Sequence, residues 1–118
     1  MISVVIPTLN SERTLPGTLT ALIPAAVDGL VREVIISDGG STDGTRKISD
    51  GCGAEFLVGS AGRGAQLAKG AAHARGPWLL FLHSDTVPQG DWMREISEFI
   101  RAVDLERRPG AAAAFRFK

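Results

Sequence analysis

Three apolar runs in this chain each end in side chains that can bind a polar ligand. The runs cover residues 4–6, 34–36 and 79–82, and their composition is typical of strands buried on both faces. The groups that follow them are Thr8-Leu9-Asn10, Asp38-Gly39-Gly40-Ser41-Thr42-Asp43 and His83-Ser84-Asp85. In an open parallel sheet, the carboxyl ends of neighbouring strands line one crevice. The sequence therefore predicts a single binding site built from three separate segments.

The elements that position these groups alternate between strands and helices. Strands are predicted at residues 2–6, 33–37, 54–58 and 78–82, and helices after Ser11, at 41–50, at 65–75 and after Pro88. We expect Pro7 to end the first strand, because proline has no N–H for the ladder. Pro24, followed by Asp28-Gly29, is expected to close the first helix. This alternation predicts an α/β fold, with a mostly parallel sheet flanked by helices and joined by right-handed crossovers.

Length and charge limit the possible classes of protein. A chain of 118 residues, 44% hydrophobic and 22% charged, indicates one domain spanning residues 1–118. Thirteen basic side chains balance thirteen acidic ones, so no global field draws the protein onto nucleic acid or an anionic membrane. Any phosphate binding must therefore be local.

The single cysteine and the short apolar runs indicate where in the cell the protein resides. Cys52 alone cannot form an intrachain disulfide, and no Cys-rich metal site is present in the sequence. The longest apolar stretch is far shorter than the roughly 18 residues that a membrane span needs. We expect a soluble, cytoplasmic domain, with peripheral association with a membrane left open.

The last residues of the sequence read as the start of another strand. Residues 111–117 are followed only by Lys118, with no turn or helix to cover them. An unprotected strand edge favours pairing with another chain. We therefore expect a domain that is truncated, or one that is completed by a partner, with homo-oligomerisation through this strand as one form.

Four motifs, in this order and spacing, resemble family-2 glycosyltransferases of the GT-A fold. They are Pro7-Thr8-Leu9-Asn10, Asp38-Gly39-Gly40-Ser41-Thr42-Asp43-Gly44-Thr45, Gly62-Arg63-Gly64-Ala65-Gln66 and Phe81-Leu82-His83-Ser84-Asp85-Thr86. The resemblance covers essentially the whole chain. It implies a GT-A-like domain that binds a nucleoside-diphosphate sugar, commonly linked to UDP or GDP, at the C-terminal edge of the sheet with a divalent cation, Mn²⁺ or Mg²⁺.

The resemblance implies that Asp38 accepts an N–H of the nucleobase. The alternative is that Asp38 only caps a turn, since Asp-Gly-Gly-Ser-Thr-Asp is also favourable turn chemistry. Gly39 stands where the family often has a second aspartate, which leaves the choice of base open.

The first loop is implied to lie under the nucleoside. Pro7 would shape it, and Thr8 and Asn10 would lie within reach of ribose or base. Glu12 is comparable to an acidic residue that the family carries near this loop. Helix capping by Asn10 and Ser11, and a favourable first-turn charge at Glu12, are the alternatives.

Asp85 is the candidate metal ligand. A divalent cation bridging a pyrophosphate needs only one or two protein carboxylates, because phosphate oxygens and waters complete its shell. The family frequently has Asp-x-Asp where this chain has His83-Ser84-Asp85. His83 and Ser84 are counted with the substrate-binding residues. His83 could contact the ribose or bind the metal, and the alternative is a strand-end histidine with a satisfied hydrogen bond.

Arg63 lies in a glycine-rich turn before a predicted helix, and Gln66 follows at the start of that helix; both are counted with the substrate-binding residues. Backbone N–H groups and the positive end of a helix favour an anion there, and the Arg63 guanidinium could pair with phosphate. The alternative is that the glycines only permit a tight turn. The motif is not a Walker motif, since it lacks the Gly-Lys-Ser/Thr ending.

The resemblance implies sugar transfer to an acceptor hydroxyl with inversion of configuration, assisted by a carboxylate base. No residue here matches that base, which lies further along the chain in the family, and the acceptor is unknown. The competing hypothesis is a catalytically incomplete nucleotide-binding or self-associating module. A nucleotidyltransferase is a weaker one, because the first loop lacks a glycine-rich, basic phosphate-binding signature.

Overall fold

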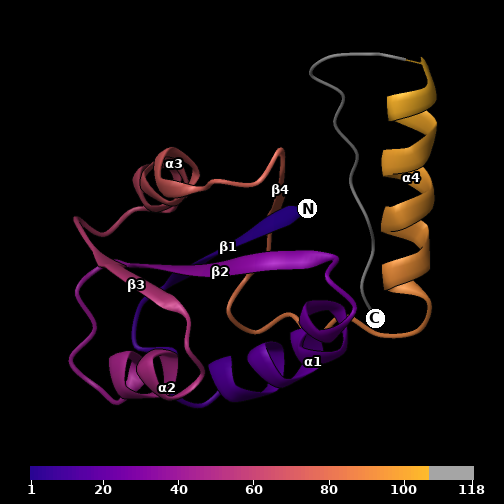
Figure 1. Ribbon diagram of the computed structural model, residues 1–118. Coiled ribbons are helices and arrows are strands. Elements are labelled where there is room, and N and C mark those ends of the chain that lie inside the picture. Colours follow the sequence, from indigo (N-terminus) through magenta and orange to yellow (C-terminus); the bar gives the residue numbers. More distant parts are fainter. Residues whose placement is uncertain (107–118) are drawn as a thin grey trace.

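A computed structural model of the protein describes residues 1–106 and shows a four-stranded parallel sheet with four helices (Figure 1). The strands are β1 (Ile2–Thr8), β2 (Val31–Asp38), β3 (Glu55–Val58) and β4 (Trp78–Phe81), and the helices are α1 (Leu15–Val27), α2 (Thr45–Gly51), α3 (Arg63–His73) and α4 (Trp92–Glu106). The predicted α/β class with a parallel sheet is confirmed.

The sheet has the order β3-β2-β1-β4, so the first strand is central. All three pairs of neighbouring strands run parallel. In the register of β1 and β2, Thr8 pairs with Asp38 at the carboxyl end. The fold thus places two of the predicted site residues directly beside one another.

Helices cover both faces of the sheet: α1 and α2 lie on one side and α3 on the other, with α4 beyond the end of the sheet in Figure 1. Successive side chains of a strand point to opposite faces. Val4 and Ile6 accordingly belong to the core cluster that contains Leu15 and Leu19 of α1, whereas Val5 faces Gly70 of α3. Both faces of β1 are buried, which explains the apolar run at residues 4–6.

Two predicted proline breaks are wrong. β1 continues through Pro7 to Thr8, and Pro7 pairs with Ser37 of β2. The last paired residues of β1 and β4 are Val5 and Phe81, so the missing N–H of Pro7 falls beyond the end of β4. Pro24 lies inside α1, which ends only at Val27, while Pro16 occupies the first turn, where proline is tolerated.

Other predicted elements begin at a different residue in the structure, and one predicted strand lies outside the described residues. The second helix begins at Thr45 rather than at residue 41, because residues 39–44 form the loop after β2. The third helix begins at Arg63, two residues earlier than predicted. The strand predicted at residues 111–117, and self-association through it, lie outside the described residues.

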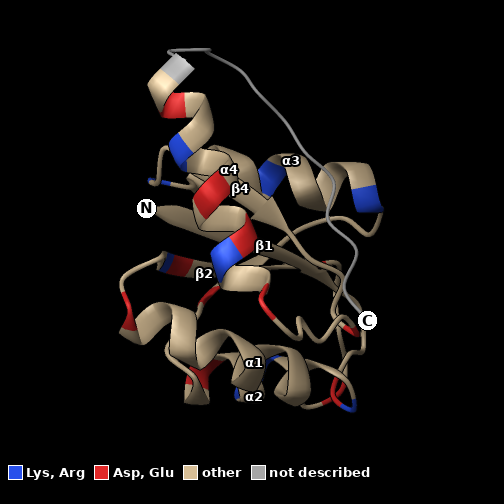
Figure 2. Ribbon diagram, turned by 90° about the vertical axis from the view of Figure 1, so that its right-hand side faces the viewer, with Lys and Arg blue, Asp and Glu red and all other residues tan. Residues whose placement is uncertain are grey.

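Charges of both signs are interspersed over the helices and loops (Figure 2). On α4, for example, Arg94 and Arg101 alternate with Glu98 and Asp104. Among the helices of residues 1–106, none combines the length and the apolar character that crossing a membrane requires.

Gly70 permits the closest approach of α3 to the sheet. A Cβ built at Gly70 would clash with the Cγ1 atom of Val5 in the central strand and lie 3.3 Å from its Cγ2 atom. The side chain of Val5 is itself fully buried, so it has little room to move. The glycine is therefore required by packing, in the middle of a helix whose sequence is otherwise rich in alanine.

We predict that Gly70→Ala lowers the free energy of unfolding by about 1–3 kcal/mol through overpacking. Gly64→Ala on the same helix is the matched control, because a Cβ there meets nothing within 4 Å. The control should leave stability unchanged or raise it by about 0.5 kcal/mol through helix propensity. Urea denaturation of the two variants measures both effects, and equal stabilities would contradict the packing argument.

Candidate functional site

Hydrogen bonds join the loops that follow β1, β2 and β4 at the carboxyl edge of the sheet. The Ser11 hydroxyl donates to the Ser84 hydroxyl at 3.0 Å, and the Ser11 N–H donates to the Thr45 hydroxyl at 2.9 Å. The Thr18 hydroxyl of α1 donates to the Ser84 carbonyl at 2.9 Å. The three strand ends therefore meet at one edge, as the sequence pattern predicts.

Asp38 is buried at this edge, with 2% of its surface exposed. Its Oδ1 accepts hydrogen bonds from the hydroxyls of Thr8 and Ser41, both at 2.6 Å. Its Oδ2 accepts from the N–H groups of Gly40 at 2.9 Å and Ser41 at 2.7 Å. A carboxylate offers about four acceptor positions, and all of them are used within the chain. Contact of this carboxylate with a nucleobase stays a prediction, and would require one of these bonds to be exchanged.

The surroundings of Asp38 stabilise its charged form. Burial raises the pKa of the Asp38 carboxyl, but the hydrogen bonds from Ser41, Thr8 and Gly40 lower it by more, and the net pKa lies below the usual range. The group is therefore a buried anion at neutral pH, with its charge directed at the turn that follows β2.

Gln66 forms a second buried cluster beside Asp38. Its Nε2 donates to the carbonyls of Thr8 at 2.8 Å and Ser37 at 2.9 Å, and its Oε1 accepts from the N–H of Gly62 at 3.0 Å. The Thr8 carbonyl also accepts the N–H of Gly39 at 2.9 Å. Both lone pairs of that carbonyl are thus in use, and the Gln66 amide bonds three separate segments of the chain.

Gly39 is packed against this cluster. A Cβ at Gly39 would lie 3.0 Å from the Ala61 Cα and 3.1 Å from the Gln66 Oε1 atom. Both distances are tighter than ordinary van der Waals contact. The aspartate that the family often carries at this place therefore does not fit here unless Ala61 or Gln66 moves.

Asn10 and Glu12 join the first loop to the loop after β2. Asn10 adopts a left-handed backbone with φ 49°. Its N–H donates to the Ser41 hydroxyl at 2.7 Å, and its Oδ1 accepts the Thr42 N–H at 2.8 Å. The Glu12 N–H donates to Asp43 at 3.1 Å, while the Glu12 carboxylate is exposed. Contact of Asn10 and Glu12 with a ligand stays a prediction.

His83 and Asp85 are exposed in the loop after β4, and Ser84 between them is partly buried. Ser84 is anchored by Ser11 and Thr18, as described above. Within residues 1–106, the Asp85 carboxylate has no hydrogen bond or ion pair to another residue. Asp85 is thus a free carboxylate on an anchored loop, which suits a ligand to a cation.

No cluster of three or more His, Cys, Asp or Glu side chains in the described part of the chain could hold a metal ion by itself. A Mg²⁺ or Mn²⁺ ion on a diphosphate needs only one or two protein carboxylates, because phosphate oxygens and waters supply its other ligands. The hard carboxylate of Asp85 fits such an ion, with phosphate oxygens as the remaining ligands.

Arg63 is the first residue of α3 and is exposed. It follows Gly62, whose φ of 140° lies in a region that side chains rarely adopt. The N–H of Gly62 is used by Gln66, so the turn is held from inside the protein while the Arg63 side chain remains in solvent. Its pairing with phosphate stays a prediction.

Sequence reasoning missed the hydroxyls that hold the loops together. Ser11 was expected to cap the first helix, but the N-cap is Thr14, and the Ser11 side chain instead reaches Ser84. Thr18 and Thr45 are fully buried within helices. Threonines on the inner side of α1 and α2, beside apolar neighbours at helical spacing, were the only signal that could have identified them.

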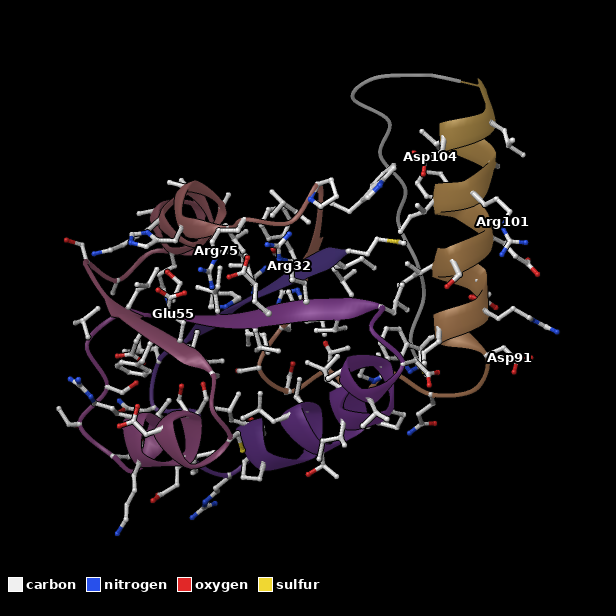
Figure 3. All side chains as sticks on the ribbon, viewed as in Figure 1. Arg32, Glu55, Arg75, Asp91, Arg101 and Asp104 are labelled. Atoms are coloured by element: carbon white, nitrogen blue, oxygen red, sulfur yellow. The ribbon has the colours of Figure 1, made fainter. Side chains whose placement is uncertain are left out.

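A groove of about 790 Å³ lies at the opposite, amino edge of the sheet. Its lining includes Met1, Leu30 and Met93, together with Arg101 and Asp104, which are labelled on α4 in Figure 3. None of the predicted site residues lines it. The groove is therefore separate from the carboxyl-edge site.

Residues 3–106 match the family model described as "Glycosyl transferase family 2", and the chain belongs to this family. The resemblance found in the four sequence motifs is confirmed.

Two curated relatives illustrate what the chain is similar to. Glucosyl-3-phosphoglycerate synthase of Mycobacterium tuberculosis (strain H37Rv) is 35% identical over 95 residues, which cover 73% of this chain and 29% of that protein. A PGL/p-HBAD biosynthesis glycosyltransferase of Mycobacterium bovis (strain BCG) is 31% identical over 114 residues, covering 85% of this chain and 41% of that protein. The chain thus spans less than half the length of these relatives.

Solved structures agree with this placement. Glucosyl-3-phosphoglycerate synthase from M. tuberculosis, in complex with Mn²⁺, UDP and glucosyl-3-phosphoglycerate, superposes with a TM-score of 0.73 at 31% identity, covering 85% of this chain and 39% of that one. The same enzyme in complex with Mg²⁺ and UDP gives the same TM-score, identity and coverage. The GT-A-like architecture of the described residues is thereby confirmed.

The low pKa of Asp38 predicts a pH dependence of stability. A carboxyl whose folded pKa is depressed stabilises the fold above its unfolded pKa, about 3.9, and loses that contribution as pH falls through the folded value. Stability of the wild type should therefore fall as pH is lowered from about 5. Asp38→Asn should be about 1–2 kcal/mol less stable at pH 7, since neutral hydrogen bonds replace charge-assisted ones, and its acid decline should be shallower.

Asp50→Asn is the control, because Asp50 is an exposed residue of α2 whose side chain only approaches Arg46. The free energy of unfolding of Asp50→Asn should equal that of the wild type at every pH. Urea denaturation at a series of pH values measures the three profiles. Parallel profiles for Asp38→Asn and the wild type would show that Asp38 does not carry this dependence.

Proposed function

We propose that this chain binds a nucleoside-diphosphate sugar with a divalent cation, at the carboxyl edge of its sheet, as the donor-binding part of an inverting glycosyltransferase. The observation that carries the proposal is the loop of Asp85. This loop is anchored through Ser84 to Ser11 and Thr18, and it presents a carboxylate without a partner among residues 1–106. Family membership over residues 3–106 supports the transferase class.

The structural neighbours support the choice of ligand. Their crystals are described as complexes with UDP, UDP-glucose, Mn²⁺ or Mg²⁺, and phosphoglyceric acid. These ligands belong to glucosyl-3-phosphoglycerate synthase. For the present chain they favour a uridine diphosphate donor as the first to test, with the sugar and the acceptor left to experiment.

The roles we propose divide between exposed and buried residues. Asp85 would hold the cation, with His83 beside it, and a bound divalent cation supplies positive charge to the leaving diphosphate. Arg63, at the positive end of α3, would bind a phosphate oxygen of the donor. Thr8, Asn10 and Gly39 would bound the space for the nucleoside.

The second candidate function is a donor-binding module without turnover. The catalytic base of the family is not matched in this chain, and Asp91, a carboxylate beside α4, is paired with Arg94 at 2.9 Å. Acceptor binding is likewise assigned to no residue here. Both candidates share the donor site, so a binding experiment tests their common part and an activity assay separates them.

We predict that UDP raises the melting temperature of the chain more strongly with Mn²⁺ than without it, and that Asp85→Asn removes the Mn²⁺-dependent part. The loss follows because a neutral amide is a far weaker ligand to a hard cation than a carboxylate. Asp104→Asn on α4 is the control, since Asp104 lies at the amino-edge groove. Thermal shift and calorimetric titration give the measurement. An Mn²⁺ effect that survives in Asp85→Asn would overturn the metal assignment.

Release of UDP or GDP from the corresponding sugar nucleotides distinguishes the two candidates. A transferase should release UDP or GDP faster than its Asp85→Asn variant does. Even without an acceptor, water can attack the bound donor and displace the nucleoside diphosphate. A binding module should bind UDP yet release none above that background. The assay is run with Mn²⁺ on the wild type, on Asp85→Asn and on the control Asp104→Asn.

A further inference from the structure

We infer that Gln66 is a positioning residue for the donor nucleotide, joining the three segments that form its site. This inference rests on the proposed function. Gln66 is 7% exposed and uses both N–H groups of its amide, with its oxygen accepting a third bond. The amide is therefore a structural connector and does not itself reach a ligand.

Each partner of Gln66 belongs to a different part of the proposed site. The Thr8 carbonyl ends β1, the Ser37 carbonyl immediately precedes Asp38 in β2, and the Gly62 N–H precedes Arg63 at the start of α3. The sequence separations are 58 and 29 residues to the strand ends and 4 to the turn. One side chain thus fixes the start of α3 against both strand ends.

Because the Gln66 side chain is buried, its hydrogen bonds hold the Gly62–Gly64 turn in one position relative to the strand ends. In a site shielded from water, breaking them removes a hydrogen bond from each of the Thr8 and Ser37 carbonyls and takes away the partner of the Gly62 N–H, which is costly. Gly62, Arg63 and Gly64 are all exposed, and the bond from the Gln66 N–H to the Gly62 carbonyl at 2.9 Å joins the turn to its own helix and not to the strand ends. Without Gln66 we expect this turn to sample several positions, so that Arg63 meets the diphosphate in only a fraction of them.

Gly39 offers a second way to disturb the same connector. A methyl group at Gly39 would lie 3.1 Å from the Gln66 Oε1 and 3.0 Å from the Ala61 Cα, so it pushes on the side chain and on the segment before Gly62. Gly39→Ala leaves the chemical groups of Gln66 intact. Its effect on nucleotide binding should therefore have the same direction as that of Gln66→Met, and a smaller size.

The test measures UDP affinity in the presence of Mn²⁺ together with amide hydrogen exchange. Gln66→Met should weaken UDP at least tenfold and accelerate exchange of the Gly62 amide, and Gly39→Ala should weaken UDP at least threefold. Gly70→Ala is the matched control on the same helix, because it destabilises α3 against Val5 without touching the turn. It should keep UDP affinity within about twofold of the wild type.

The outcomes separate the inference from the proposed function. A wild type that binds neither UDP nor GDP overturns both. A wild type that binds UDP, with Gln66→Met and Gly39→Ala binding equally well, overturns the inference alone. Equal losses in Gln66→Met and Gly70→Ala also overturn it, because the effect would then be general loss of stability. Should Gln66→Met fail to fold, a loss of UDP affinity in Gly39→Ala together with faster exchange of the Gly62 amide supports the inference, and wild-type affinity or wild-type exchange in that variant overturns it.

Discussion

The structure depends on how polar groups are satisfied where β1 and β2 end. A parallel sheet leaves its last carbonyl groups and the N–H groups of the following loops at one edge, and burial there is costly without partners. In this chain the carbonyls of Thr8 and Ser37 receive N–H groups from Gln66, and the N–H groups of Gly40 and Ser41 are received by Asp38. These two side chains, distant in sequence, hold the edge in one arrangement.

This constraint divides the candidate site into two sets of residues. The buried set uses its hydrogen-bonding capacity within the chain and so determines where the loops lie. The exposed set, which includes Arg63, His83 and Asp85, keeps its capacity for a ligand. A glycosyltransferase of this family must hold a flexible, doubly charged donor in one orientation, and a rigid edge that carries a few exposed charges suits that task.

The apolar runs and their polar ends were sufficient to predict the parallel sheet and the meeting of the three loops. Those features depend on local periodicity and on a general property of parallel sheets, both visible in sequence. The roles of Asp38 and Gln66 were not visible in this way. Asp38 stands in a motif that suits a turn and a ligand equally, and only the positions of Thr8 and Ser41 show that its acceptors are in use.

Gln66 was grouped with Arg63 because the two share a glycine-rich motif, yet Arg63 is exposed at the start of α3, whereas Gln66 is buried and donates to the strand ends. Its partners Thr8 and Ser37 are remote in sequence, and no local rule indicates them. Pro7 teaches a similar lesson, because β4 has already ended where the missing N–H of Pro7 would have needed a partner. The position of Pro24 inside α1 has no such explanation in the structure.

The most direct test of the central claim is a nuclear magnetic resonance titration of the wild type with UDP and a small amount of Mn²⁺, whose unpaired electrons broaden nearby amide signals. If the donor site lies at the carboxyl edge, broadening should concentrate at residues 83–86 and reach residues 61–64, and it should need UDP as well as Mn²⁺. Broadening centred on residues 28–30 and 93–101, around the amino-edge groove, would contradict the account.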